Sequence, residues 1–260
     1  MVAMTAGGAL AAPNRVPKVT PDFWLVKLLA VTMGETAADY LAVNLGFGLS
    51  VTSWIMSVIL AVTLILQFRQ GRYVPWSYWA AVVMISVVGT LITDNLVDNF
   101  GVALETTTIF FAVALALTFA LWYLWERTLS IHSVVTTRRE IFYWLAILFT
   151  FSLGTAAGDL VAEKFALGYL STGVLFMAIV GLFWLAYAMG MNAIFCFWLA
   201  YIFTRPLGAS FGDLLSQPME YGGLGFGTTV TSVIFLAGIV MIVIYMTVSR
   251  AGEEFSLEAS

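Results

Sequence analysis

The sequence repeats one pattern four times: a Trp, nine residues, a Gly, four more residues and an Asp. A pattern that returns in this way predicts several copies of one structural unit packed side by side. Each Asp lies in or at the end of a long apolar stretch, where a carboxylate is costly and usually functional. The four copies need no gap and are Trp24/Gly34/Asp39, Trp79/Gly89/Asp94, Trp144/Gly154/Asp159 and Trp198/Gly208/Asp213.

The chain is too apolar for a water-soluble domain. Of its 260 residues, 61% are hydrophobic and 10% are charged, whereas ordinary soluble domains are nearer half apolar and a quarter charged. Lipid must therefore be the solvent. The sequence predicts an all-α, polytopic membrane protein with eight transmembrane helices built from four parallel two-helix repeats. Windows long enough to cross ~30 Å of hydrocarbon lie at roughly 23–44, 51–68, 76–97, 106–125, 141–163, 171–188, 191–215 and 228–248.

The repeats are expected to be parallel, because each holds two spans and so begins on the same side as the last. Such units are related by an axis along the membrane normal. The Asp-to-Asp steps are 55, 65 and 54 residues, and the polar loop 126–140 accounts for the longer one. We take this loop as the boundary between two four-helix halves. The predicted segments are an N-terminal tail 1–20, repeat 1 at 21–74, repeat 2 with the central loop at 75–140, repeat 3 at 141–190, repeat 4 at 191–249 and a C-terminal tail 250–260.

The basic residues predict the orientation in the membrane. Almost all of them fall at the termini or at the even-to-odd connections, while Lys164 falls on the opposite side and Arg205 lies within a span. By the positive-inside rule both tails are then cytoplasmic. No apolar core of signal-peptide length precedes the first span, so we expect no cleaved signal sequence. The residues at the predicted cytoplasmic side are Arg15, Lys18, Lys27, Arg69, Arg72, Arg127, Arg138, Arg139 and Arg250.

Identical spacing predicts that equivalent residues of the four repeats lie at equal depth. Each Trp is expected at the inner interface, where tryptophans anchor helices to the headgroup region; these anchors are Trp24, Trp79, Trp144 and Trp198. Each Asp follows fifteen residues later, or ~22 Å along a helix. The four carboxylates are therefore expected in one layer in the outer half of the membrane.

Small residues precede each Asp and predict close helix packing. The Gly of the pattern and the residue four positions later form a small-xxx-small pair in every repeat, which lets helix backbones approach in lipid. Such packing would also bring neighbouring aspartates together. The pairs are Gly34/Ala38, Gly89/Thr93, Gly154/Gly158 and Gly208/Gly212.

The aspartates are the candidate ion- and proton-binding residues, although each could instead cap a helix or bond a Thr hydroxyl, and duplication copies structural residues as faithfully as functional ones. Glu35 lies one helical turn before Asp39 on the same face. Two carboxylates this close in a low dielectric should not both ionise, so we interpret them as a proton-handling pair. Alternatively, Glu35 points to a polar partner such as Arg205. Its equivalents in the other repeats are Thr90, Thr155 and Ala209.

Further polar residues are candidates for a supporting role. Arg205 is either a counter-ion to a carboxylate or a residue that snorkels to the inner face. The adjacent Pro206 is expected to kink or break its helix, which would free carbonyls to line a cavity or bind a cation. Asn95 and Asp98 follow the second Asp and could belong to an outer vestibule, whereas most polar residues near them are expected to be loop and cap. The supporting set is Arg205, Asn95, Asp98, Thr90 and Thr155.

Several functional classes lack the residues that they need. The net charge of −4 and the lack of a basic run argue against nucleic acid binding. One cysteine and one histidine, Cys196 and His132, supply no haem, iron–sulfur or soft-metal site. The stretch 208–212 matches a G-x-S-x-G elbow, but the elbow needs a strand, a turn and a histidine partner. We expect no enzyme activity and no bound cofactor.

The four two-helix units, each with its Trp, resemble a bacterial membrane-protein family defined by four tandem copies of a repeat of unknown function, the DUF347 type. The resemblance covers roughly residues 20–250. It implies an eight-span protein of the bacterial inner membrane and supplies no activity to carry over to the residues of this chain.

The leading hypothesis is a proton-coupled secondary transporter for a small hard cation. The aspartates would bind cation and proton in exchange, and oxygen-only ligands favour Mn²⁺, Mg²⁺, Ca²⁺ or alkali ions. The two halves would rock against each other. Alternatives are a cation channel with an aspartate ring, and a membrane enzyme or complex subunit without transport. The sequence leaves open the substrate, the direction and stoichiometry, a homo-oligomer, and whether Asp39, Asp94, Asp159 and Asp213 share one site as metal ligands.

Overall fold

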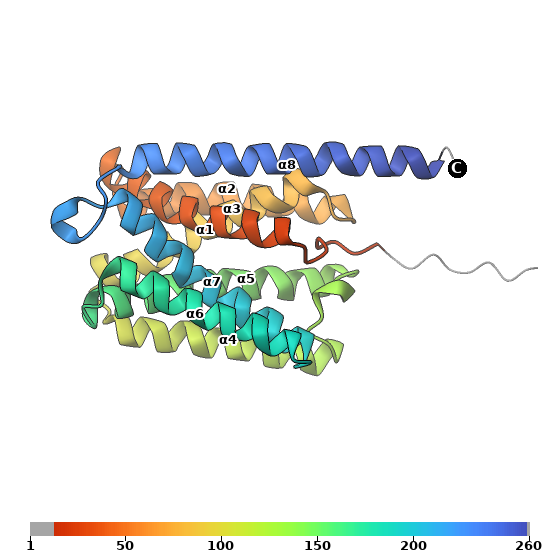
Figure 1. Cartoon of the computed structure of the whole chain (residues 1–260), viewed down its shortest axis with the longest axis horizontal. Coiled ribbons are helices and arrows are strands. Elements are labelled where there is room, and N and C mark those ends of the chain that lie inside the picture. The colour runs from red at the N-terminus through yellow and green to blue at the C-terminus, as the bar shows by residue number, and fades with distance from the viewer. Residues whose placement is uncertain (1–12, 259–260) are drawn as a thin grey trace, which may run out of the picture.

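The computed structural model describes residues 13–258, with side chains to residue 249, and the regular secondary structure of this range is helical, without a strand. The parts of the predicted tails at 1–12 and 259–260 lie outside the described residues. The long helices run roughly parallel along the longest axis of the molecule (Figure 1). They are α1 (Pro21–Asp39), α2 (Leu49–Gln70), α3 (Pro75–Asp94), α4 (Leu104–Glu126), α5 (Thr137–Asp159), α6 (Gly168–Ala188), α7 (Ala193–Ser216) and α8 (Thr228–Glu258).

Local sequence signals set where the helices begin and end. The Thr20 hydroxyl accepts a hydrogen bond from the Phe23 N–H and Pro21 follows at the first helical position, an arrangement that satisfies a free N–H and pre-sets the backbone. Thr136 caps α5 in the same way. At the other end of a helix, Gly71 terminates α2 with φ 63°, a left-handed conformation that glycine adopts without strain.

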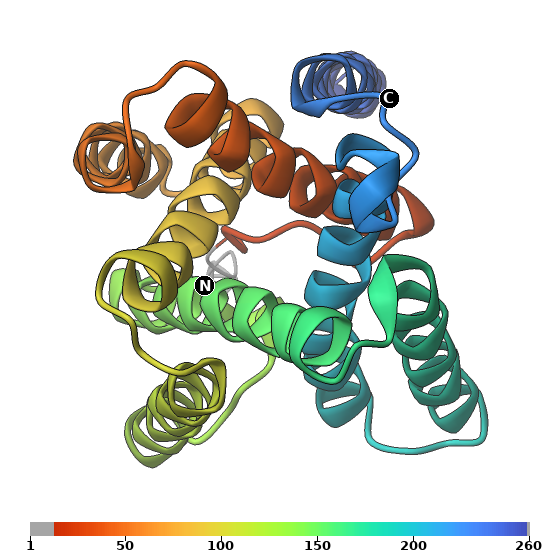
Figure 2. The same cartoon turned by 90° about the vertical axis from the view of Figure 1, so that its left-hand side faces the viewer.

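The odd-numbered helices form a closed ring, which Figure 2 shows in end view. In this ring α1 packs on α3, α3 on α5, α5 on α7, and α7 again on α1. Each even-numbered helix lies outside the ring and covers the inner helix of the next repeat, so α2 packs on α3, α4 on α5 and α6 on α7. The circle closes because α8 packs on α1. Eight helices in four parallel repeats are therefore confirmed, but contacts continue around the ring and the loop 126–140 does not separate two halves.

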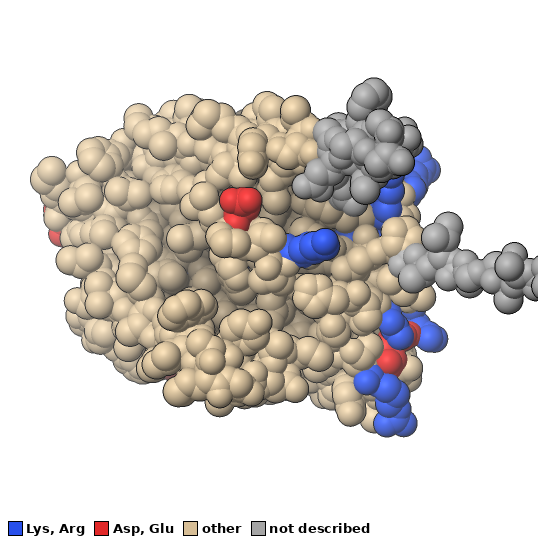
Figure 3. All heavy atoms as spheres, turned by 45° about the vertical axis from the view of Figure 1, so that its right-hand side comes forward, with Lys and Arg blue, Asp and Glu red and all other residues tan. Residues whose placement is uncertain are grey.

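Seven helices of the described range are long and apolar enough to cross a membrane, and the chain is a multi-pass membrane protein. The first helix, α1, carries Lys27 and Glu35 in its interior and is the exception; both side chains are buried inside the bundle. Figure 3 shows Lys and Arg gathered at one end of the molecule, with few charges along its flank. We call this end, where the segment 13–20 lies, the basic end, and the end where the inner helices terminate the acidic end.

The repeated glycines are the places where neighbouring inner helices touch. Each Gly of the pattern faces the residue that lies eight positions before the Asp of the next repeat. A methyl group added at Gly208 would lie 2.5 Å from Val31 Cγ1, and one at Gly89 would lie 2.9 Å from Phe151 Cβ. The four contacts are Gly34 with Ser86, Gly89 with Phe151, Gly154 with Arg205 and Gly208 with Val31. Only a glycine leaves room for these side chains. A methyl group added at Gly158 or Gly212 would lie 3.5 or 3.2 Å from its nearest neighbour, so these two contacts are less tight.

The repeated tryptophans do not form the expected lipid-facing belt. Trp79, Trp144 and Trp198 are 1%, 4% and 4% exposed and belong to the core of the bundle. Trp198 donates from its indole to the Leu129 carbonyl at 2.9 Å. The prediction that they face the lipid interface is wrong, because they face neighbouring helices. Trp24 is half-buried against Phe23 and Phe197. The three most exposed tryptophans lie on the outer helices and are Trp54, Trp125 and Trp184, whereas Trp76 at the start of α3 is 49% exposed.

Parts of the two predicted terminal tails have defined structure. The Arg15 guanidinium binds the Glu140 carboxylate at 2.7 Å, and the Asn14 amide donates to the Ile131 carbonyl at 3.0 Å. The stretch before α1 is therefore packed across the basic end. At the other terminus α8 continues as a helix through Glu258 instead of ending near residue 248.

The tight glycine contacts can be tested with two matched substitutions. Gly208→Ala should lower the free energy of unfolding by about 1–3 kcal/mol, as overpacking does, because Val31 and its backbone must shift. Gly181→Ala, on the outer helix α6 where a methyl group meets nothing within 4 Å, should be neutral or stabilising by about 1 kcal/mol from helix propensity. Unfolding of both variants in detergent gives the comparison, and equal stabilities would contradict the ring packing.

Candidate functional site: an acidic cavity at the end of the helix ring

The four repeated aspartates line one cavity at the acidic end of the ring. Its volume is ≈ 220 Å³. The inner helices α1, α3, α5 and α7 each end at or just after their Asp, so the ring brings the four carboxylates to a common space. The lining residues are Glu35, Asp39, Val43, Leu49, Asp94, Val97, Asp98, Leu104, Asp159, Glu163, Tyr169, Asp213 and Gln217.

All four aspartates are half-buried, so each remains in contact with the cavity. The Gln217 amide donates to Asp39 at 3.3 Å. Within the described part of the chain, the carboxylates of Asp94, Asp159 and Asp213 have neither a hydrogen bond nor an ion pair to another side chain. These three aspartates therefore do not bond a Thr hydroxyl, which was the structural alternative for them.

The helices change geometry directly after the aspartates. In three repeats the α-helix passes into a π-helical turn, at Tyr40–Asn44, Asn95–Asn99 and Leu160–Lys164. Such turns are rare and frequently occur at functional sites. The residues four positions after each Asp lie at the rim of the cavity, and they are Val43, Asp98, Glu163 and Gln217. Two further carboxylates thus join the four, and both are exposed.

An ion pair forms the floor of the cavity. Arg205 Nη2 lies 2.8 Å from Glu35 Oε2, and the guanidinium also donates to the hydroxyls of Thr90 and of Thr155, the latter at 2.7 Å. Thr90 donates to Glu35 at 3.1 Å. Glu35 therefore has Arg205 as its polar partner. Arg205 is fully buried, so it is a counter-ion and does not snorkel to the inner face. Glu35 nevertheless lines the same cavity as Asp39.

The equivalent positions of the four repeats explain this floor. Four residues before each Asp stand Glu35, Thr90, Thr155 and Ala209. The one arginine of the layer beneath, Arg205, reaches three of these positions from the fourth repeat. It fits there because Gly154 leaves room for its side chain. The floor is therefore one pseudo-fourfold layer in which each repeat supplies a different group.

The charges of the cavity have one sign. Seven carboxylates line it, from Glu35, the four repeated aspartates, Asp98 and Glu163, and Arg205 at the floor is paired with only one of them. Like charges enclosed by apolar walls focus a negative potential and raise the local concentration of cations. The chemistry of the cavity is therefore suited to cations and protons.

Among the described residues, no three His, Cys, Asp or Glu side chains are close enough together to hold a metal ion directly. The proposal that Asp39, Asp94, Asp159 and Asp213 act as metal ligands stays a prediction. A cation in this arrangement would contact some of them through water.

Sequence reasoning and the structure differ on several supporting residues. Asn95 does not line the cavity; its amide donates to Ser53 Oγ at 2.6 Å and to the Leu91 carbonyl at 2.8 Å, which ties α3 to α2. Glu163, Tyr169 and Gln217 line the cavity although the sequence analysis did not select them. Their signal is the repeat register, since Glu163 and Gln217 each follow their Asp by four residues.

Pro206 does not break its helix. The α7 helix runs without interruption from Ala193 to Ser216, and Pro206 packs against Gly154 and Gly158 of α5. In the turn before this proline the Tyr201 carbonyl accepts a hydrogen bond from the Lys27 ammonium at 2.6 Å. Lys27 is therefore a fully buried side chain, although its position in the sequence suggested the cytoplasmic face.

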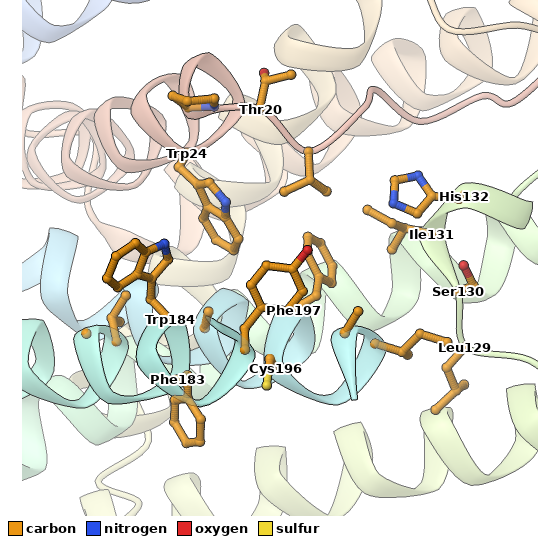
Figure 4. Close-up of a pocket in the computed structure, with 18 residues that line it drawn as sticks. Thr20, Trp24, Leu129, Ser130, Ile131, His132, Phe183, Trp184, Cys196 and Phe197 are labelled. Carbon is orange, nitrogen blue, oxygen red and sulfur yellow. The ribbon is translucent and has the colours of Figure 1, made fainter. Parts of the chain in front are cut away.

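A second cavity, of ≈ 650 Å³, lies between the start of α1, the helices α6 and α7, and the loop that precedes α5 (Figure 4). Trp24, Phe183, Trp184 and Phe197 give it a largely apolar lining, and His132 lies at one side (Figure 4). None of its lining residues is acidic. It therefore has no part in the carboxylate chemistry of the first cavity.

Comparison with known proteins places the repeats in a family. A family model described as Repeat of Unknown Function (DUF347) matches four stretches of the chain, at residues 23–73, 77–128, 142–191 and 196–251. No curated protein and no solved structure matches the chain.

The buried ion pair can be tested with a double-mutant cycle. Glu35→Gln or Arg205→Met alone should lower the free energy of unfolding by about 3–5 kcal/mol, because each leaves a buried charge without its partner. The double substitution should cost clearly less than the sum of the two. Denaturation in detergent micelles measures the cycle. Glu105→Gln, which removes the half-exposed pair with Lys164, should have little effect. Additive single effects at Glu35 and Arg205 would contradict the pairing.

Proposed function

The chain belongs to the family built from DUF347 repeats, and we propose, from the chemistry of its acidic cavity, that it is a proton-coupled secondary transporter for a small hard cation. The observation that carries the proposal is that all four repeated aspartates line one cavity. Intramembrane carboxylates are costly and typically mark ion or proton pathways. Four of them around a common space make a purely structural role a poor explanation.

The ligand atoms support a hard cation. The cavity offers carboxylate oxygens, the Gln217 amide and the Tyr169 hydroxyl, and oxygen ligands suit Mn²⁺, Mg²⁺, Ca²⁺ and alkali ions better than copper or zinc. A volume of ≈ 220 Å³ holds about seven waters at roughly 30 Å³ each. A small cation therefore fits together with much of its hydration shell. Mn²⁺ is our working substrate within this set.

Crowding of the carboxylates supports coupling to protons. Neighbouring carboxylates in a low dielectric cannot all be ionised at once, so some of them hold protons when no cation is bound. A cation that enters neutralises the charge and displaces those protons. Exchange of one for the other at Asp39, Asp94, Asp159 and Asp213 is the coupling step that we propose.

Closure of the ring toward the basic end favours a transporter over a channel. Beneath the Glu35–Arg205 pair, Lys27 and Phe151 are fully buried, and the next layer is aromatic, with Tyr78 and Tyr143 joined by a hydroxyl–hydroxyl hydrogen bond of 2.5 Å. A cavity open at one end only is the geometry of one state in an alternating-access cycle. A channel would need a continuous water-filled path for the ion.

We further propose that the protein lies in the bacterial inner membrane with both termini in the cytoplasm. Lys and Arg gather at the basic end (Figure 3), and the positive-inside rule assigns such an end to the cytoplasm. The acidic cavity then opens to the opposite side.

Because the ring of inner helices has no division into halves, the conformational change would be a tilt of inner helices instead of the rocking of two four-helix bodies.

Transport can be tested in proteoliposomes with Mn²⁺ as the probe and a pH gradient as the driving force. Wild-type protein should accumulate Mn²⁺, and Asp→Asn at any of the four repeated positions should reduce the rate by at least about 10²-fold, the range typical of lost proton-transfer groups. Asp22→Asn, at an exposed residue of the first turn of α1, should transport like the wild type.

Two outcomes would contradict the proposal. Full activity of the quadruple Asp→Asn variant would show that the carboxylates carry no ion. Single-channel currents far above transporter turnover would replace the transporter by a channel with an aspartate ring.

A further inference from the structure

We propose that Lys27 is a second proton-binding site, beneath the floor of the acidic cavity, and that three buried tyrosines, Tyr201, Tyr143 and Tyr78, carry its proton toward the basic end. The inference rests on the proposed function, because it adds the route by which the coupled proton crosses the closed half of the ring. It assigns a role to buried titratable groups that the cavity itself does not use.

Lys27 has the surroundings of an internal proton carrier. Its side chain is fully buried, and its Nζ donates to the Tyr201 carbonyl at 2.6 Å and to the Thr204 hydroxyl. The same atom lies 4.1 Å from the centre of the Tyr201 ring. Within the described chain, no carboxylate forms an ion pair with it. A buried ammonium without a carboxylate beside it is costly, so this amine is able to give up its proton and take one back during a cycle.

The groups facing Lys27 come from two neighbouring inner helices. They are Tyr201 and Thr204 on α7 and the ring of Phe151 on α5. The outer helix α8 packs on α1. The side chains of α8 that the structure describes include one titratable residue, the exposed Tyr245. The Arg205 guanidinium lies near the same Phe151 ring as the amine and does not itself release a proton.

The link to the cavity floor runs past Arg205. Its Cζ lies 5.5 Å from the centre of the Phe151 ring, and Lys27 Nζ lies 5.9 Å from the same ring centre. Two of its donor atoms, Nε and Nη1, are buried without a hydrogen-bond partner in the described protein. Buried donors of this kind are the places where ordered water binds. Water beside Arg205 would connect Glu35 above it with Lys27 below it.

The proposed link to the basic end uses the hydroxyl groups of Tyr201, Tyr143 and Tyr78. The Tyr201 hydroxyl is buried and has no partner among the described residues, so it is free to accept from or donate to Lys27 or a water. The rings of Tyr201 and Tyr143 both contact Trp198, at 6.0 and 6.2 Å between ring centres. Tyr143 in turn shares the 2.5 Å hydroxyl–hydroxyl hydrogen bond with Tyr78.

The last step reaches the basic end through a buried polar network. Glu140, one turn before Tyr143 on α5, accepts from Gln67 at 3.2 Å and pairs with Arg15 at 2.7 Å. Glu140 is 1% exposed, whereas Arg15 is partly exposed. Buried polar groups thus occur at several levels of the ring between the acidic cavity and the packed N-terminal segment.

Each transfer is a simple proton exchange. When Lys27 receives a proton from the cavity side, the O–H bond of a protonated cavity aspartate breaks and leaves a carboxylate. Water relays the proton by accepting one and releasing another, and an N–H bond forms at Nζ. When it releases the proton, that N–H bond breaks, and a hydroxyl oxygen accepts the proton while passing its own proton on. No electron moves, and no group other than the proton is transferred.

The test uses two assays on the full-length protein in proteoliposomes with Mn²⁺. One measures accumulation driven by a pH gradient, and the other measures exchange of Mn²⁺ at equal concentrations on both sides, which needs no net proton movement. The ratio of driven accumulation to exchange should fall at least about tenfold in Lys27→Met and in Lys27→Arg, as expected for loss of a proton-transfer group. Lys18→Arg, at an exposed lysine, should leave the ratio unchanged.

Lys27→Arg separates a proton carrier from a structural cation. Arginine keeps the positive charge but does not release its proton, so a wild-type ratio in this variant would overturn the proposal. Tyr143→Phe removes only a hydroxyl and should also lower the ratio; a wild-type ratio there would overturn the tyrosine part even if both Lys27 variants failed to fold. Loss of exchange and accumulation in the wild type itself would instead contradict the proposed transport function.

Discussion

Close approach of four helix backbones is the constraint on which the rest of this structure depends. Where the inner helices touch, each repeat presents a glycine to a side chain of the next repeat, as Gly154 does to Arg205 and Gly208 to Val31. Association of helices in lipid relies on such contacts, since lipid provides no hydrophobic driving force between helices. A larger residue at these points would separate the helices and with them the carboxylates. The glycines therefore serve the acidic cavity without touching it.

The ring is symmetric in backbone and asymmetric in chemistry. Duplication supplies the same acid at the same depth four times, whereas the layers beneath differ from repeat to repeat. Glu35, Arg205 and Lys27 each occur once, and the equivalent positions hold Thr, Ala, Val, Ser, Phe, Ile or Tyr. A ring of identical acids would suit a symmetric pore. Single charged residues beneath the aspartates instead fill the ring with buried side chains and one ion pair.

Much of the architecture follows from the sequence, because membrane helices must be long, apolar and evenly spaced in depth. Eight helices, four parallel repeats and a common layer of aspartates could be predicted from apolar windows and from the register of one motif. Direction around a helix could not. Trp79 and Trp198 turn inward, because in a bundle of eight helices an aromatic side chain can bury its ring against neighbouring helices as well as against lipid headgroups.

Pairing between repeats was equally hidden from the sequence. The partner of Glu35 is 170 residues away in the chain, and the choice between Asp39 and Arg205 depends on how the fourth repeat meets the first. Lys27 resembles an interfacial lysine when only its distance from the start of α1 is considered. Its burial results from ring closure, which places α7 beside α1. Arg205 lies eight residues before Asp213 and Lys27 lies twelve residues before Asp39. These two registers would have indicated that both side chains belong to the layers beneath the aspartates.

The most direct measurement of the central claim is water access to the four aspartate positions. Cys196, the one cysteine, is buried, so a Cys196→Ser background leaves each Asp→Cys variant with a single reporter thiol. All four thiols should react with a membrane-impermeant cationic reagent, and only from the side opposite the basic end. Reaction with lipid-soluble reagents alone, or access from opposite sides at different positions, would mean that the four carboxylates do not share a wet cavity.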